Sequence, residues 1–259
     1  MADFTIVKGM VDGQTIATWT QDWWTWALQA PYVTNPLLDT TGAYAGINNN
    51  EPVYFVAGTA SDFGGPANVD RMFDVPAGKP LLIPVLNSFD TLDPKNVENM
   101  DMQAFQNGVR GLFAEIDGVP IKNLQSCLVR TDFFSMGPTR LGSLAEQIGA
   151  PLGVDLSPTK SSGYWLMVEG LAPGQHTLEF GGSLNTGFST MTIDQITVDP
   201  LGTLEVSSAA LFSSPTVIPG VVPELSTWAM MILGFVSLCL AGWLARRKAI
   251  AALPTPKAD

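Results

Sequence analysis

Oxygen-bearing side chains are most concentrated between Asn87 and Asp101 of this 259-residue chain. Asn87, Asp90 and Asp93 recur at every third position, and Ca²⁺ prefers about six to eight carboxylate, amide or carbonyl oxygens as ligands. We expect a loop here, and loops at the ends of sandwich strands often supply such ligands. The spacing does not match an EF-hand, so the alternative is a solvated acidic loop. Asn87, Asp90 and Asp93 are therefore a candidate calcium site.

Nucleophilic catalysis has no recognisable set of residues in the sequence. A Ser-His-Asp triad would have to use the single histidine, His176, and no serine stands in a Gly-x-Ser-x-Gly elbow. His176 falls on the apolar face of an expected strand, which indicates a neutral imidazole at the edge of the core. Cys127 has no recognisable partner. We expect no catalytic residues, although two acids facing each other across a cleft would support glycosidase chemistry.

The charge and cysteine content narrow the classes of partner. The chain has 13 basic and 24 acidic residues and a net charge of −11, so it repels phosphate backbones and we expect no nucleic-acid partner. Its 2 cysteines and 1 histidine are too few for a structural zinc site. A phosphate-binding loop is also missing. Apart from Ca²⁺, we expect no cofactor.

A tryptophan-rich helix is expected from Ala17 to Gln29. Trp19, Trp23 and Trp26 share one face of it, and a tryptophan stripe at helical spacing is typical of core packing. Trp24 lies off that face. We therefore expect Trp24 to be exposed, where its ring could stack on a sugar.

Most of the remaining segments read as short strands separated by turns. Val53–Ala57 is an apolar run typical of a buried strand. Phe73–Val75 and Leu81–Leu86 predict a hairpin, with Pro84 at an edge or a bulge. Phe113–Ile121 predicts a second hairpin that turns at Asp117-Gly118.

The second half continues this pattern. Three runs predict an antiparallel meander: Tyr164–Val168, Gln175–Phe180 and Phe188–Val198. Short helices are expected at Asp101–Gly108 and Ser143–Ile148. The fold class is therefore mainly β, a β-sandwich or jelly-roll-like domain with a few short helices.

The C-terminal region contains a predicted transmembrane helix. The segment from Trp228 to Ala245 is apolar and uncharged, and at roughly 1.5 Å per residue it is long enough to cross a bilayer. Trp228 and Trp243 stand near its ends, where indole rings favour the headgroup interface. Arg246, Arg247 and Lys248 follow directly. Positive charge favours the cytoplasmic side, which predicts an inner-membrane protein with its N-terminal domain in the periplasm or outside the cell.

The amino-acid sequence of this tail resembles the PEP-CTERM sorting signal of Gram-negative bacteria. A short motif precedes the apolar helix and the basic cluster, with Leu225 where the family pattern has a second proline; it comprises Val222, Pro223, Glu224, Leu225, Ser226 and Thr227. The resemblance implies recognition by an exosortase-type membrane protease or transpeptidase. It also implies export, release to the cell surface after processing, and an association with extracellular polysaccharide.

Export also requires a leader. Residues 1–30 contain no pattern of a basic, then an apolar, then a small-residue segment. We therefore expect a leader that is encoded upstream of Met1 or has been trimmed; the alternative is that the C-terminal helix itself directs translocation.

The body of the chain resembles a family of uncharacterised exported bacterial proteins. The resemblance rests on WTQDWWTWALQAP, PVYFVAGT, VPAGKPLLIPVLNS and GYWLMVEGLAPGQHTLEFGG, and it implies no activity. The expected organisation has four parts: an extracytoplasmic β-rich domain at 1–198, a Pro/Ser-rich spacer with the sorting motif at 199–224, the transmembrane helix at 225–245, and a basic cytoplasmic tail at 246–259.

These features favour a non-enzymatic, exported surface or matrix protein that binds carbohydrate or Ca²⁺. A secreted carbohydrate-active hydrolase is one alternative. A single-span accessory subunit of a larger membrane complex is another. The expected partners are the membrane, a processing enzyme and extracellular polysaccharide.

Overall fold

The computed structural model describes residues 4–61, 65–91 and 102–200, which all belong to one unit, Met1–Glu205. The sorting motif, the predicted membrane span with its flanking residues, and Asp93 lie outside the described residues. Within them, no helix has the length and apolar character needed to cross a membrane. The described part is mainly β, as predicted.

The first sheet has five strands in the order β1-β10-β6-β4, with β9 also paired to β10. Their bounds are β1 Thr5–Val7, β4 Tyr54–Phe55, β6 Leu81–Thr91, β9 Leu128–Arg130 and β10 Thr159–Glu169. The long central pair β6 and β10 runs antiparallel, whereas β4 is parallel to β6.

The second sheet also has five strands, in the order β5-β12-β11-β7-β8. Their bounds are β5 Asn68–Val75, β7 Val109–Ile116, β8 Val119–Pro120, β11 Gly174–Leu184 and β12 Ser189–Val198. β5 is parallel to β12, and the other neighbours are antiparallel. Burial alternates strictly along β5, which indicates a sheet with one solvated face.

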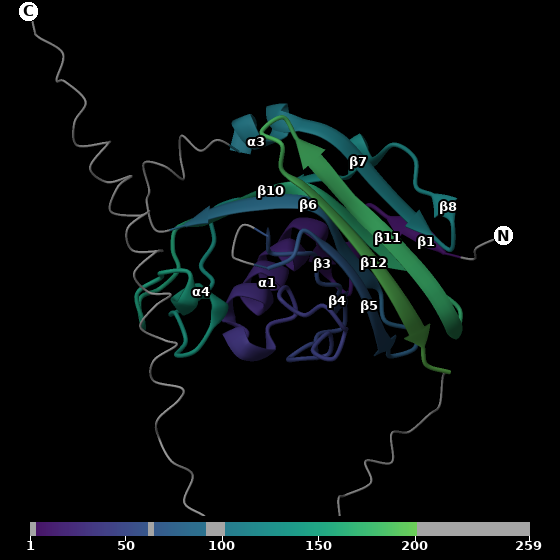
Figure 1. Ribbon diagram of the computed structural model, residues 1–259, viewed down its shortest axis with the longest axis horizontal. Coiled ribbons are helices and arrows are strands. Elements are labelled where there is room, and N and C mark those ends of the chain that lie inside the picture. Colours follow the sequence, from purple (N-terminus) through teal and green to yellow (C-terminus); the bar gives the residue numbers. More distant parts are fainter. Residues whose placement is uncertain (1–3, 62–64, 92–101, 201–259) are drawn as a thin grey trace, which may run out of the picture. The chain divides into compact units, whose positions relative to one another are not determined.

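Side chains of both sheets form one core cluster, including Ile83, Leu166, Leu178 and Ile196, and this arrangement is consistent with a β-sandwich (Figure 1). The other face of the first sheet packs against helix α1, Ile16–Gln29, in a second cluster. The first sheet is therefore buried on both faces. This explains why β6 begins as a continuous apolar run instead of an alternating one.

The tryptophans of α1 pack in the core, as predicted for Trp19, Trp23 and Trp26. Thr15 caps the helix by accepting a hydrogen bond from the Thr18 amide. Each of the three indole N–H groups donates to a backbone carbonyl: Trp19 to Val11 at 2.9 Å, Trp23 to Val56 at 2.8 Å and Trp26 to Ile47 at 2.7 Å. These bonds fix the helix against the chain segments around it.

The minor elements complete the chain between the strands. The predicted short helices are present as α3, Met102–Gly108, and α4, Leu144–Gln147, the latter capped by Ser143. Two 3-10 turns, η1 Tyr32–Thr34 and η3 Leu124–Cys127, and a small ribbon of β2 Met10–Val11 and β3 Gln14–Thr15 occupy connections.

Two predicted strand pairings are wrong. β5 and β6 lie in different sheets and form no hairpin, and β10 lies in a different sheet from β11, so the predicted meander keeps only the β11–β12 hairpin. Turn residues such as Pro76 and Gly78 mark a chain reversal. They do not specify whether the chain stays in one sheet or crosses the sandwich, and here both strands fill the same core from opposite sides.

One predicted bulge and one predicted turn are confirmed. The register of β6 with β10 shifts next to Pro84, because Leu86 pairs with Tyr164 while Pro84 pairs with Trp165. A bulge is what allows proline in a central strand. The β7–β8 hairpin turns at Asp117 and Gly118, whose φ angles of 53° and 71° fit a type I′ turn.

A buried ion pair joins two strands of the second sheet. Arg71 of β5 lies directly beside Asp194 of β12 in the register, and the guanidinium contacts both carboxylate oxygens, at 2.7 and 3.0 Å. It also donates to the carbonyls of Pro36, Ala57 and Gly58. Burial raises the pKa of Asp194, and the attraction of Arg71 opposes that shift.

Replacing Asp194 with Asn leaves the Arg71 guanidinium buried without a counter-charge. We expect the free energy of unfolding to fall by about 3–5 kcal/mol in urea denaturation. Asp70→Asn is the control, since Asp70 lies on the exposed face of β5, the strand that carries Arg71, and contacts Gln195 at 3.4 Å. Equal losses for both variants would contradict a stabilising role for the pair.

Candidate functional site

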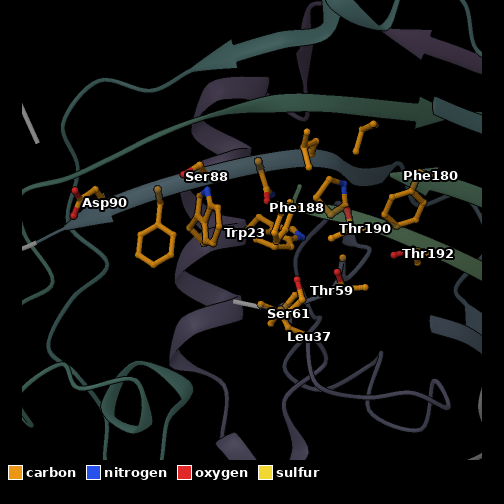
Figure 2. A pocket seen from close by; sticks show the side chains of 18 of the residues that line it. Trp23, Leu37, Thr59, Ser61, Ser88, Asp90, Phe180, Phe188, Thr190 and Thr192 are labelled. Carbon is orange, nitrogen blue, oxygen red and sulfur yellow. The ribbon is translucent and has the colours of Figure 1, made fainter. Parts of the chain in front are cut away.

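A cavity of about 380 Å³ lies where β6 passes α1 and the second sheet (Figure 2). Its walls come from α1, from the segment 58–61 that follows β4, from the second half of β6, and from Phe180, Phe188, Thr190 and Thr192 around the β11–β12 hairpin. The volume is at the low end of the roughly 300–1,000 Å³ that is typical of small-molecule sites.

Residues with unpartnered polar atoms are concentrated in the lining of this cavity. In the described part of the chain, five buried side-chain N or O atoms have no hydrogen-bond partner, and four of their residues line the cavity: Trp24, Thr59, Ser61 and Asn87. The fifth atom is the Tyr54 hydroxyl, in the sandwich core. Each such atom costs about 1–3 kcal/mol in the folded state, so a cluster of four calls for an explanation. A bound ligand that supplies the missing partners is one.

Aromatic rings form the apolar wall beside these atoms. The rings of Trp24 and Phe89 lie 4.4 Å apart between centroids, and Trp23 meets Trp24 edge to face at 5.0 Å. Trp23 is itself anchored through its bond to Val56 and its contact with Trp165 at 5.1 Å. The wall is therefore held by a fixed helix and a fixed strand.

The polar side of the cavity carries hydroxyls and a single acid. Ser88, Asp90 and Thr91 line it from β6, and Thr190 and Thr192 from β12. The Asp90 carboxylate accepts from the Thr91 amide at 2.7 Å. Among the described lining residues, Asp90 is the one acid and none is basic.

Two of the predicted calcium residues, Asn87 and Asp90, are not on a loop. Asn87 and Asp90 belong to β6, because that strand keeps pairing with β10 as far as Thr91, and this ladder overrides the turn-like composition. Asn87 lies opposite Gly163, where a Cβ atom would sit 2.5 Å from that of Asn87, so glycine leaves the room that Asn87 occupies. Asp93 lies outside the described residues. Among the described residues, no three His, Cys, Asp or Glu side chains group as metal ligands would.

Trp24 is not exposed as predicted. Its exposure is 4%, because Trp23 and Phe89 pack against it even though it lies off the main core face of α1. It does line the cavity, so its stacking on a ligand stays a prediction.

His176, which its strand pattern predicted to be a neutral imidazole at the edge of the core, has an oxygen partner at each ring nitrogen. It lies outside the cavity, with Nδ1 2.8 Å from a carboxylate oxygen of Asp117 and Nε2 2.8 Å from the Ala172 carbonyl. Burial lowers its pKa, but the bonds to Asp117 and Ala172 outweigh that effect and raise the pKa above its ordinary value. The other Asp117 oxygen accepts from the Thr177 amide, so Asp117 ties the β7–β8 turn to β11 through both His176 and Thr177.

Thr59 and Ser61 had no signal in the sequence. Small polar residues after Gly58 are typical of an ordinary turn, and only the fold brings them to α1 and β6. Thr190 and Thr192 of β12 could not be predicted as lining residues for the same reason. Cys127, in contrast, is a buried free thiol away from this cavity.

The His176 pairing predicts a pH-dependent contribution to stability. Because the folded-state pKa is raised, the charged imidazole stabilises the fold fully below the unfolded pKa near 6.5, and this is lost as the pH rises through the folded pKa. In urea denaturation, His176→Gln should therefore reduce stability more at about pH 5 than at about pH 9. Asp117→Asn should abolish that difference. A deficit independent of pH would argue against a charged His176.

The orphan hydroxyl of Thr59 predicts an unusual mutational result. Thr59→Val removes an unsatisfied group, so the ligand-free protein should be unchanged or more stable by up to about 1 kcal/mol. Thr20→Val is the matched control, because the fully buried Thr20 hydroxyl donates to Ala17 at 2.8 Å and its loss should cost about 0.5–1.5 kcal/mol. Urea denaturation of both variants makes the comparison. If Thr59→Val destabilised as much, Thr59 would have a partner.

The chain was also compared with known proteins. No protein-family model, no curated protein and no solved structure matches it.

Proposed function

We propose that this chain is an exported, non-enzymatic surface or extracellular-matrix protein whose β domain binds carbohydrate in the cavity between α1, β6 and β12. The observation that carries the proposal is the set of four unpartnered polar groups beside an aromatic wall. A fold keeps such groups at a loss of stability, and a ligand that pairs with them recovers it.

Sugars have the two properties that this cavity matches. Their hydroxyl and ring oxygens accept and donate hydrogen bonds, while their C–H faces pack on aromatic rings. The Trp24 indole and the Asn87 amide nitrogen are donors only, and the hydroxyls of Thr59 and Ser61 adapt to either role. Phe89 adds ring surface next to Trp24.

Binding is favoured over hydrolysis by the acids of the cavity. Glycosidases use two carboxylates roughly 5–10 Å apart. Among the described lining residues, Asp90 alone is acidic. Calcium binding has weaker support than sugar binding, because Asn87 and Asp90 are the only members of the predicted site that the described residues include.

The tail supports the exported part of the proposal. Pro223-Glu224 precedes the apolar segment, and Arg246 to Lys248 follow it, which matches an inner-membrane span with the β domain outside the cytoplasm. An exosortase-type enzyme would process the chain near this motif and release it to the surface, where extracellular polysaccharide is the expected partner.

The binding proposal predicts that the purified full-length protein binds glycans on an array and in calorimetry. Asn87→Leu should weaken binding roughly twofold to tenfold, since it removes one hydrogen bond to a neutral ligand. Tyr54→Phe is the control, because it removes the orphan hydroxyl that lies outside the cavity and should leave affinity unchanged. Failure of every glycan to bind, or equal affinity for Asn87→Leu, would refute the proposal.

The sorting proposal predicts a shortened mature chain. Mass spectrometry of the C-terminus in the native host should find cleavage near Glu224, and deletion of the exosortase-type gene should preserve the tail through Asp259. An intact tail in the wild-type host would instead indicate a permanently anchored protein.

A further inference from the structure

The charges around the cavity restrict the sugars that it can hold. Apart from Asp90, every described residue that lines it is uncharged, and the chain as a whole is strongly acidic. Among the described lining residues, an anion would find no cationic partner to replace the hydration that it loses, and it would face the Asp90 carboxylate. Neutral ligands avoid both penalties.

The donors set a second restriction. Trp24 Nε1 and Asn87 Nδ2 can only donate, so the ligand must present acceptor oxygens at two places. Hydroxyl and ether oxygens meet this need without carrying charge. A ligand that exposes only C–H groups would leave both donors unpaired.

The backbone that carries each donor is held in place before any ligand arrives. The α1 backbone that carries Trp24 is fixed by the bonds of Trp23 and Trp26 to backbone carbonyls, and Asn87 is set in the ladder opposite Gly163. Preorganised groups favour the one ligand geometry that satisfies them, since little conformational entropy is lost on binding.

On these grounds, and resting on the proposed carbohydrate function, we infer that the cavity selects a single neutral sugar ring and excludes acidic sugars. The ring packs on the Trp24–Phe89 wall, and its hydroxyl or ring oxygens accept from Trp24 and Asn87. The volume of about 380 Å³ fits one ring better than an extended chain.

Matched pairs of ligands test this selection. Each pair combines a neutral methyl hexopyranoside of the gluco, galacto or manno series with its uronic acid, which differs only in a carboxylate at carbon 6. Calorimetry uses the full-length protein in a detergent without a sugar headgroup, because a glycosidic detergent would compete for the site. For at least one pair we expect the neutral sugar to bind roughly tenfold or more tightly than the acid.

A cation introduced into the lining tests whether charge causes the preference for neutral sugars. Thr190→Lys places a cation in the lining and should narrow the preference for the neutral sugar several-fold, whereas Thr190→Met, of similar length and uncharged, should not.

Equal or tighter binding of the uronic acids by the wild type would overturn the inference and leave carbohydrate binding intact. Narrowing by Thr190→Met as much as by Thr190→Lys would also overturn it. If neither member of any pair bound while longer glycans did, the single-ring assignment would be wrong; if no glycan bound, the proposed function would fail with it.

Discussion

The guanidinium of Arg71 connects the second sheet to the segments that shape the cavity. It sits in register with Asp194, and its remaining N–H groups donate to the carbonyls of Pro36, Ala57 and Gly58. The cavity is lined by residues of these same segments: Leu37, Gly58, Thr59 and Ser61. A buried arginine with several carbonyl partners holds irregular backbone in one conformation, because other conformations would leave some of its N–H groups buried without acceptors.

The first sheet provides the second constraint. One face of β6 and β10 packs in the sandwich core and the other against α1, so the strands have no solvated side along most of their length. Toward Thr91 the buried residues of β6 give way to partly exposed ones. The cavity forms at this transition, where α1 still covers the sheet but its packing is no longer complete. A cavity at the edge of two core clusters has rigid walls and is also open to solvent.

Two neighbouring tryptophans differ in how their indole N–H groups are paired. Trp23 and Trp24 are neighbours on the same helix, and both are buried. The indole of Trp23 has a backbone acceptor at 2.8 Å, while that of Trp24 has none. Natural cores pair such groups almost without exception, so among the described residues the Trp24 indole is an exception that fold stability does not explain.

Local sequence determined the elements of this protein, and tertiary packing determined their partners. Helical spacing of Trp19, Trp23 and Trp26 was enough to predict α1 and its buried face, and Asp117-Gly118 was enough to predict a tight hairpin, because both signals act within a few residues. The crossing of the chain between β5 and β6 could not be predicted in this way, since a turn reverses the chain equally well within a sheet and between two sheets. The burial of Trp24, the contacts of His176 and the placement of Thr59 and Asn87 around one cavity depend on residues distant in the chain, and only the packed fold brings those residues together.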